Sequence, residues 1–164
     1  MKRLFLLRHA KSSRDEAGLP DRDRPLAARG RRAVELMAGH LRDEKISPAL
    51  VLCSSARRTR ETLEGIEPSG EVRIEDELYG ASESELLERL RDVSDGTESV
   101  MLIGHNPAIQ ELALSLAGGG KRRAEVERKF PTAALATLTV SDSWRELAPG
   151  SAELVEFVRP KDLR

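Results

Sequence analysis

The sequence predicts an α/β fold built on a mostly parallel central sheet, with helices covering its faces. Short apolar runs alternate along the chain with longer segments whose apolar residues recur at helical spacing. This alternation is typical of parallel strands joined by right-handed crossovers. The 164 residues suit one domain, which we place at residues 1–164. A composition of 39% hydrophobic residues with a formal net charge of -1 excludes intrinsic disorder.

The first half of the chain predicts three strands and two helices. The run that ends at Leu7 is continuously apolar, as expected for a central strand covered on both faces. Pro25 stands near the start of the first helical pattern, and Gly65 and Pro68 close the second. In chain order we expect a strand over 2–7, a loop over 10–25, a helix over 26–44, a strand over 49–53, a helix over 57–64 and a strand over 72–74.

The second half continues the alternation and then becomes richer in strands. Three glycines at residues 118–120 mark the end of the last apolar helical pattern. The strands that follow this point are expected at sheet edges. In chain order we expect a helix over 83–93, a strand over 100–103, a helix over 108–117, strands over 134–140 and 154–158, and a shorter strand near 144–147.

Composition excludes several classes of protein. The single cysteine, Cys53, allows no intrachain disulfide. No apolar stretch approaches the roughly 20 residues that a membrane helix needs. A net charge near zero, with 3% aromatic residues, argues against nucleic-acid binding. We therefore expect a cytoplasmic monomer with no nucleic-acid or membrane partner.

The candidate chemistry follows the predicted strands, each at the point where the strand ends. In an open α/β sheet, ligands bind beyond the carboxyl ends of the strands. Two of the three histidines, several arginines and a carboxylate cluster would therefore meet at one edge. In strand order the sequence places there Arg8-His9, Ser54 to Arg58, Glu75-Asp76-Glu77, and Gly104-His105.

Two histidines beside arginines predict phosphoryl transfer. A neutral imidazole is a good nucleophile near pH 7, and its attack on phosphorus gives a phosphohistidine intermediate. Arginine forks stabilise the charge on the transferring phosphoryl group, and a second histidine can donate to one of its oxygens. A carboxylic acid could protonate the leaving group and later activate water. This scheme requires neither a metal nor a cofactor, and we expect none.

These residues resemble the motifs of the histidine phosphatase superfamily. Arg8-His9-Ala10 is similar to the Arg-His-Gly triplet that follows the first strand in that family. The alanine in place of glycine is similar to the pattern of the small phosphohistidine phosphatases of the SixA type. The second block, Ser-x-x-x-Arg-Ala-x-x-Thr, is matched by Ser54, Arg58 and Thr62, with Thr59 in place of the alanine, and the third block is matched by Gly104-His105. The matches extend from residue 4 to about residue 107.

The resemblance implies a phosphoglycerate mutase-like fold, which is a three-layer α/β/α sandwich. It implies His9 as the catalytic nucleophile and Arg8, Arg58 and His105 as phosphate-binding residues. Glu77 is the best-placed candidate for a general acid, although the small phosphohistidine phosphatases often do without one.

The resemblance also implies a metal-independent phosphatase whose partner is a phosphorylated protein carrying phosphohistidine. Two alternatives stay open: a phosphatase of small phosphate esters, and a catalytically silent phosphate-binding module on the same fold. The mixed-charge run at residues 121–129 is interpreted either as a solvated face or as a rim that guides an acidic phosphoprotein.

Overall fold

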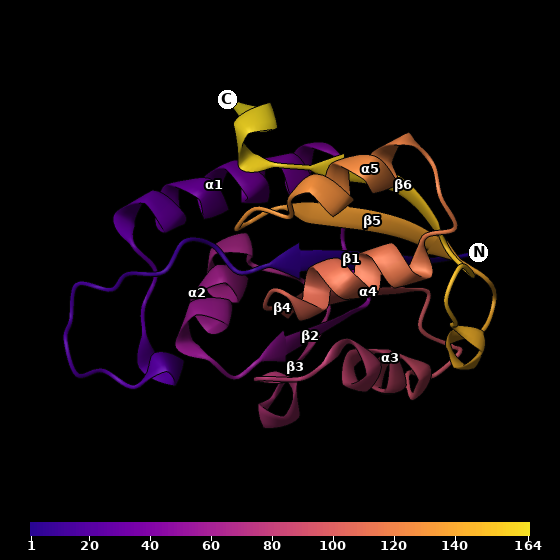
Figure 1. The fold of residues 1–164 in the computed structure, drawn as a ribbon, viewed down its shortest axis with the longest axis horizontal. Helices are drawn as coiled ribbons and strands as arrows, with labels where there is room; N and C mark the ends of the chain where they lie inside the picture. Colours follow the sequence, from indigo (N-terminus) through magenta and orange to yellow (C-terminus); the bar gives the residue numbers. More distant parts are fainter.

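One mixed sheet organises the molecule (Figure 1). The computed structural model describes residues 1–164, except for the side chain of Lys121. The sheet has six strands in the order β3-β2-β4-β1-β5-β6, and the first four of these run parallel. β5 pairs antiparallel with both β1 and β6. The strands are β1 (Lys2–Arg8), β2 (Leu50–Ser54), β3 (Glu71–Glu75), β4 (Ser99–Gly104), β5 (Leu135–Val140) and β6 (Glu153–Val158).

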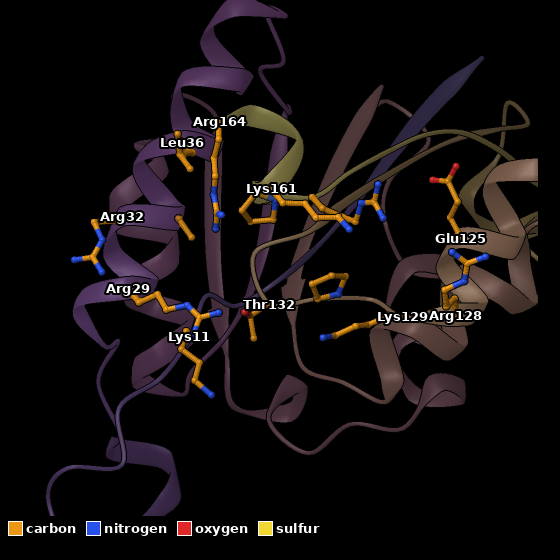
Figure 2. Close-up of a pocket in the computed structure, with 14 residues that line it drawn as sticks. Lys11, Arg29, Arg32, Leu36, Glu125, Arg128, Lys129, Thr132, Lys161 and Arg164 are labelled. Carbon is orange, nitrogen blue, oxygen red and sulfur yellow. The ribbon is translucent and has the colours of Figure 1, made fainter.

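Helices cover both faces of this sheet, which confirms the predicted α/β sandwich with a mostly parallel sheet. A 3-10 turn, η4 (Pro160–Leu163), lies at the C-terminus beside the long first helix (Figure 1). A cavity lined largely by basic side chains lies between these two elements and the segment before β5 (Figure 2). The α-helices are α1 (Ala28–Asp43), α2 (Arg57–Ile66), α3 (Glu83–Arg91), α4 (Ala108–Leu116) and α5 (Lys121–Arg128).

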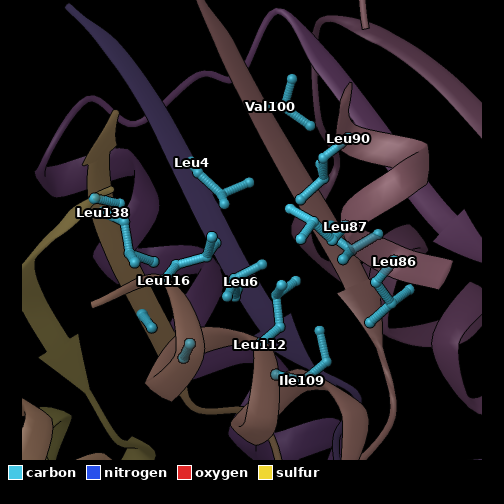
Figure 3. Close-up of a cluster of buried hydrophobic side chains, with 14 of the residues drawn as sticks. Leu4, Leu6, Leu86, Leu87, Leu90, Val100, Ile109, Leu112, Leu116 and Leu138 are labelled. Atoms are coloured by element: carbon cyan, nitrogen blue, oxygen red, sulfur yellow. The ribbon is translucent and has the colours of Figure 1, made fainter. Parts of the chain in front are cut away.

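The alternating side chains of β1 divide the core into two layers. Leu4 and Leu6 pack with residues of α3 and α4, including Leu87 and Leu112 (Figure 3). Phe5 and Leu7 belong to the opposite cluster, which contains residues of α1 and α2. Successive side chains of a strand point to opposite faces, so an uninterrupted apolar run is what a doubly covered strand requires.

Three expectations for the last third of the chain need correction. The segment near 144–147 is a 3-10 turn, η3 (Trp144–Glu146), and not a strand. The Trp144 indole is fully buried and donates to the Thr97 carbonyl at 2.8 Å, while the Trp144 amide donates to the Asp95 carboxylate at 3.0 Å. These bonds hold the segment against the α3–β4 connection and away from a sheet edge.

The second correction concerns β5, which lies between β1 and β6, so β6 alone of these strands forms an edge. The third is α5, a helix that was not expected within the charged run 121–129. The sequence of α5 carries almost no helical apolar pattern, which is why it was not predicted as a helix. Among its described side chains, only that of Val126 is fully buried.

Among the described residues, no helix combines the length and the apolarity needed to cross a bilayer.

Candidate active site

Two adjacent parallel strands bring the two predicted site histidines together. Arg8 of β1 pairs in register with Gly104 of β4, and the His9 amide donates to the Gly104 carbonyl at 3.1 Å. His9 and His105 therefore follow neighbouring strand ends, and their ring centroids lie 5.3 Å apart. The predicted convergence of these residues at one edge of the sheet is what the structure shows.

The His9 side chain is held in one tautomer. Its Nδ1 lies 2.7 Å from the Ala10 carbonyl oxygen, which can only accept, so Nδ1 carries the proton. In the neutral ring the lone pair is then on Nε2. Burial, followed by the positive potential of His105, Arg58 and Arg8, lowers the pKa of His9 to about 3, against the opposing effect of the Ala10 hydrogen bond. At neutral pH this histidine is an uncharged base with a free Nε2 lone pair.

His105 is also uncharged near pH 7. Burial is the main cause that lowers its pKa to about 4, and Arg58 and Arg8 add to the effect while Asp21 opposes it. Its Nε2 lies 2.8 Å from the Ser54 hydroxyl at the end of β2. Because a hydroxyl can donate or accept, this contact positions the ring while leaving both tautomers possible.

The two predicted phosphate-binding arginines reach the same place from different elements. Arg8 ends β1, and its Nη1 donates to the Phe130 carbonyl at 2.9 Å. Its Nε is buried and has no hydrogen-bond partner among the described residues. Burial lowers the pKa of Arg8. Arg58 lies in the first turn of α2, 8% exposed, beside the end of β2. Both cations act on the pKa of His9, as expected for groups that surround one phosphoryl site.

Asp21 is the site carboxylate that the sequence interpretation did not identify. Arg58 donates to its backbone carbonyl at 2.8 Å and to its side-chain Oδ2 at 3.0 Å. The Tyr79 hydroxyl donates to the same Oδ2 at 2.7 Å, and its ring lies edge-on to His105 at 5.7 Å. The Tyr79 bond, then those from Arg58 and Arg24, hold the pKa of Asp21 well below its usual range, so Asp21 stays ionised.

Glu77 takes a different position from the one expected of a general acid. It lies exposed on the 3-10 turn η2 (Asp76–Leu78). Its neighbour Glu75, and not Glu77, forms the hydrogen bonds with Arg89 of α3 that chiefly raise the pKa of that arginine. No hydrogen bond joins Glu77 to His9, His105 or Arg58 in the described part of the molecule. Its role as an acid stays a prediction.

Thr62 connects the histidine loop to the arginine helix. Its hydroxyl accepts from the buried Ala10 amide at 3.1 Å and donates to the Arg58 carbonyl at 2.8 Å. Gly30 of α1 supports the same loop, because a Cβ at this position would lie 2.1 Å from the Lys11 carbonyl oxygen. Thr62 therefore holds the backbone at Ala10, and Gly30 leaves room for the backbone at Lys11.

The described residues contain no group of three or more His, Cys, Asp or Glu side chains arranged to hold a metal ion. The candidate site consists of imidazoles, guanidiniums and one ionised carboxylate.

Comparison with known proteins agrees with this geometry. The model of the histidine phosphatase superfamily (branch 1) matches residues 4–82, which include Arg8, His9 and Arg58. A solved structure from Nakamurella multipartitia, assigned as the phosphohistidine phosphatase SixA, superposes with a TM-score of 0.88 and 31% identity, covering 97% of this chain and 96% of that one. The chain belongs to the histidine phosphatase superfamily.

Two further relatives extend the match over the full length of this superfamily member. An uncharacterized protein of Mycobacterium tuberculosis strain H37Rv is 39% identical over 159 residues, covering 94% of this chain and all of the relative. The structure of the protein histidine phosphatase SixA complexed with tungstate superposes with a TM-score of 0.82 at 26% identity, covering 99% of both chains. The fold is therefore phosphoglycerate mutase-like, with a SixA-like arrangement of its elements.

Proposed function

We propose that this chain is a phosphatase that uses His9 as its nucleophile and acts on phosphohistidine in a protein. The observation that carries the proposal is the state of the His9 ring. Its Nδ1 proton is engaged by the Ala10 carbonyl, so the free lone pair is on Nε2, in a ring that lies beside His105 and within the field of Arg8 and Arg58. A neutral nucleophile surrounded by cations suits attack on a phosphoryl dianion.

The reaction proceeds in two displacements. His9 Nε2 attacks phosphorus, the N–P bond forms, and the bond between phosphorus and the leaving group breaks. Water then attacks the phosphohistidine, the N–P bond breaks, and inorganic phosphate leaves with the return of neutral His9. Arg8, Arg58 and His105 contact the phosphoryl oxygens and stabilise the charge spread over them. Apart from the attacking water, both steps use only side chains of this chain.

The acid–base character of the site favours a phosphoramidate substrate over an alkyl phosphate. Asp21 bonds to Arg58, but its lowered pKa keeps it ionised and unable to supply a proton near pH 7. Glu77 is exposed, and within the described residues no hydrogen bond joins it to His9, His105 or Arg58. An alkoxide leaving group requires a proton, whereas a phosphorylated imidazole leaves far more readily. The names of the SixA relatives are consistent with this substrate class.

Trapping the intermediate tests the proposal. Wild-type protein mixed briefly with a phosphohistidine peptide carrying labelled phosphate and then denatured in alkali should retain the label on His9. His9→Ala should retain none, and His40→Ala is the matched control because His40 lies in α1 outside the site. Tungstate binding without label or turnover would instead identify a silent phosphate-binding module. Equal or faster turnover of small alkyl phosphates would identify a small-ester phosphatase.

A further inference from the structure

A basic cavity lies next to the phosphoryl site and takes no part in the proposed chemistry. It has a volume of about 740 Å³, and eight of its lining side chains are cationic against one carboxylate, that of Glu125. Figure 2 shows Arg29 of α1 and Lys129, after α5, reaching toward each other on either side of Thr132. The net charge of the whole chain is -1, so positive charge is concentrated on this face.

The backbone joins the cavity directly to the active site. Lys11 lines the cavity and follows His9 by two residues, which places their Cα atoms at most about 7 Å apart. On the opposite wall, Thr132 precedes Ala133, whose amide donates to the His9 carbonyl at 3.0 Å. Two walls of the cavity are therefore connected to the backbone of His9.

The cations of the cavity are available to a partner. In the part of the chain that the structure describes, Arg159 is the only one of them paired with a carboxylate, that of Asp162 at 3.1 Å. Arg29, Lys129 and Lys11 are exposed. An exposed, unpaired cation loses little hydration when an acidic side chain approaches it, so such a surface steers and positions an anionic partner.

We infer that this cavity docks an acidic segment of the phosphoprotein substrate beside its phosphohistidine. The inference rests on the proposed function and extends it to the partner. The cations come from four separate segments: the loop after β1, helix α1, the end of α5 with the residue that follows it, and the C-terminal residues around η4. Charges spread over the walls of so large a cavity fit several carboxylates along a polypeptide. A single small phosphate would require a convergent cluster, which this chain already has around His9. Of the two interpretations of residues 121–129, this inference favours the rim that guides an acidic phosphoprotein, with Lys129 as its part at the cavity wall.

The test uses two phosphohistidine peptides of equal length, one flanked by Asp and Glu and the other by Asn and Gln. Wild-type protein should prefer the acidic peptide by about tenfold in kcat/KM. The double variant Arg29→Glu/Lys129→Glu should lose this preference, because two weak attractions become repulsions. A glutamate in the first turn of α1 is favourable to the helix, so the variant should fold.

Matched controls separate docking from folding and from overall charge. Arg42→Glu/Arg145→Glu makes the same change in net charge at exposed positions outside the cavity and should keep the preference. Turnover of an aryl phosphate should stay within about threefold in both double variants. Raising the ionic strength from about 0.1 M to about 1 M, which shortens the screening length from about 10 Å to about 3 Å, should abolish the wild-type preference.

The outcomes distinguish this inference from the proposed function. Equal turnover of both peptides by wild-type protein overturns the docking surface and leaves the phosphatase intact. If no substrate is turned over, anisotropy of the labelled acidic peptide decides: weaker binding by the Arg29/Lys129 variant alone supports the docking surface, and equal binding by all variants overturns it. Tight binding of inorganic tripolyphosphate without any peptide preference would assign the cavity to a small polyanion and overturn the inference.

Discussion

Replacing Thr62 by valine should weaken both the fold and the site, because one buried hydroxyl holds two active-site segments together. Thr62 is 1% exposed, and it accepts from the Ala10 amide at 3.1 Å while donating to the Arg58 carbonyl at 2.8 Å. Valine keeps the volume of the side chain and removes both bonds. The Arg58 carbonyl still accepts from the helix amide four residues on, so it keeps a partner.

The magnitude follows from the group that is left without a partner. The Ala10 amide belongs to a residue with no exposed surface, and an unsatisfied buried amide costs about 1–3 kcal/mol. For a chain of this size, a loss of about 2 kcal/mol lowers Tm by roughly 4–8 °C. The loop that carries His9 is also released from α2, and we expect kcat for a phosphohistidine peptide to fall by about tenfold, because small misplacements of a reacting group are costly.

Urea unfolding, thermal melting and steady-state turnover measure these effects, with Thr62→Ser as the matched variant. Serine keeps the hydroxyl and loses a buried methyl, which costs about 1 kcal/mol, so it should be slightly less stable yet retain the wild-type kcat. The reasoning would be refuted if Thr62→Val were as stable and as active as wild type. Loss of kcat in the serine variant equal to that in the valine variant would also contradict it.

Three further predictions concern charge at the site. The folded pKa of His9, about 3, lies below its ordinary value of 6.5, so the folded state binds fewer protons between these values. The free energy of unfolding of the protein, measured in urea, should therefore fall as the pH drops from about 6.5 toward 3. In the His9→Gln variant it should fall less steeply over the same range. Asp21→Asn removes a half-exposed anion beside Arg58, so tungstate should bind more tightly and its inhibition constant should decrease by about two- to fivefold. We also expect kcat to fall in this variant. An unchanged inhibition constant would contradict the prediction. Glu77→Gln should leave phosphohistidine turnover within about twofold, and a tenfold loss would establish Glu77 as the acid.

The residues at the strand ends could be predicted from the sequence because the rule that places them is geometric. Parallel strands end at the same edge of their sheet, so locating two apolar runs was enough to bring His9 and His105 together. The same rule located the segment Ser54 to Arg58, because α2 begins three residues after β2 ends, and the resemblance to the superfamily motif then selected Arg58. No knowledge of individual side-chain contacts was needed for this part of the site.

The remaining site groups depend on contacts that no local pattern records. Asp21 reaches Arg58 across 37 residues of sequence, from a polar loop without periodicity. The Phe130 carbonyl that binds Arg8 is 122 residues away. The signal that could have drawn attention to Asp21 is the run Asp21 to Arg24 before a proline, where acidic and basic residues are crowded beside the start of α1. Glu77, the acid that the resemblance suggested, follows the edge strand β3, whereas His9, Arg58 and His105 follow the more central β1, β2 and β4.

The alanine at position 10, where the superfamily pattern has glycine, is compatible with the geometry of His9, the proposed nucleophile. Glycine is favoured where the backbone has a positive φ, and the non-glycine residues with positive φ in the described chain are Lys45, Glu67 and Ala133. Ala10 is not one of them, so its Cβ introduces no backbone strain. That methyl is fully buried in the cluster between the sheet, α1 and α2. The functions of residue 10 are performed by its backbone, because its carbonyl fixes the tautomer of His9 and its amide binds Thr62. A side chain that packs into the core behind the loop is therefore compatible with the role proposed for His9.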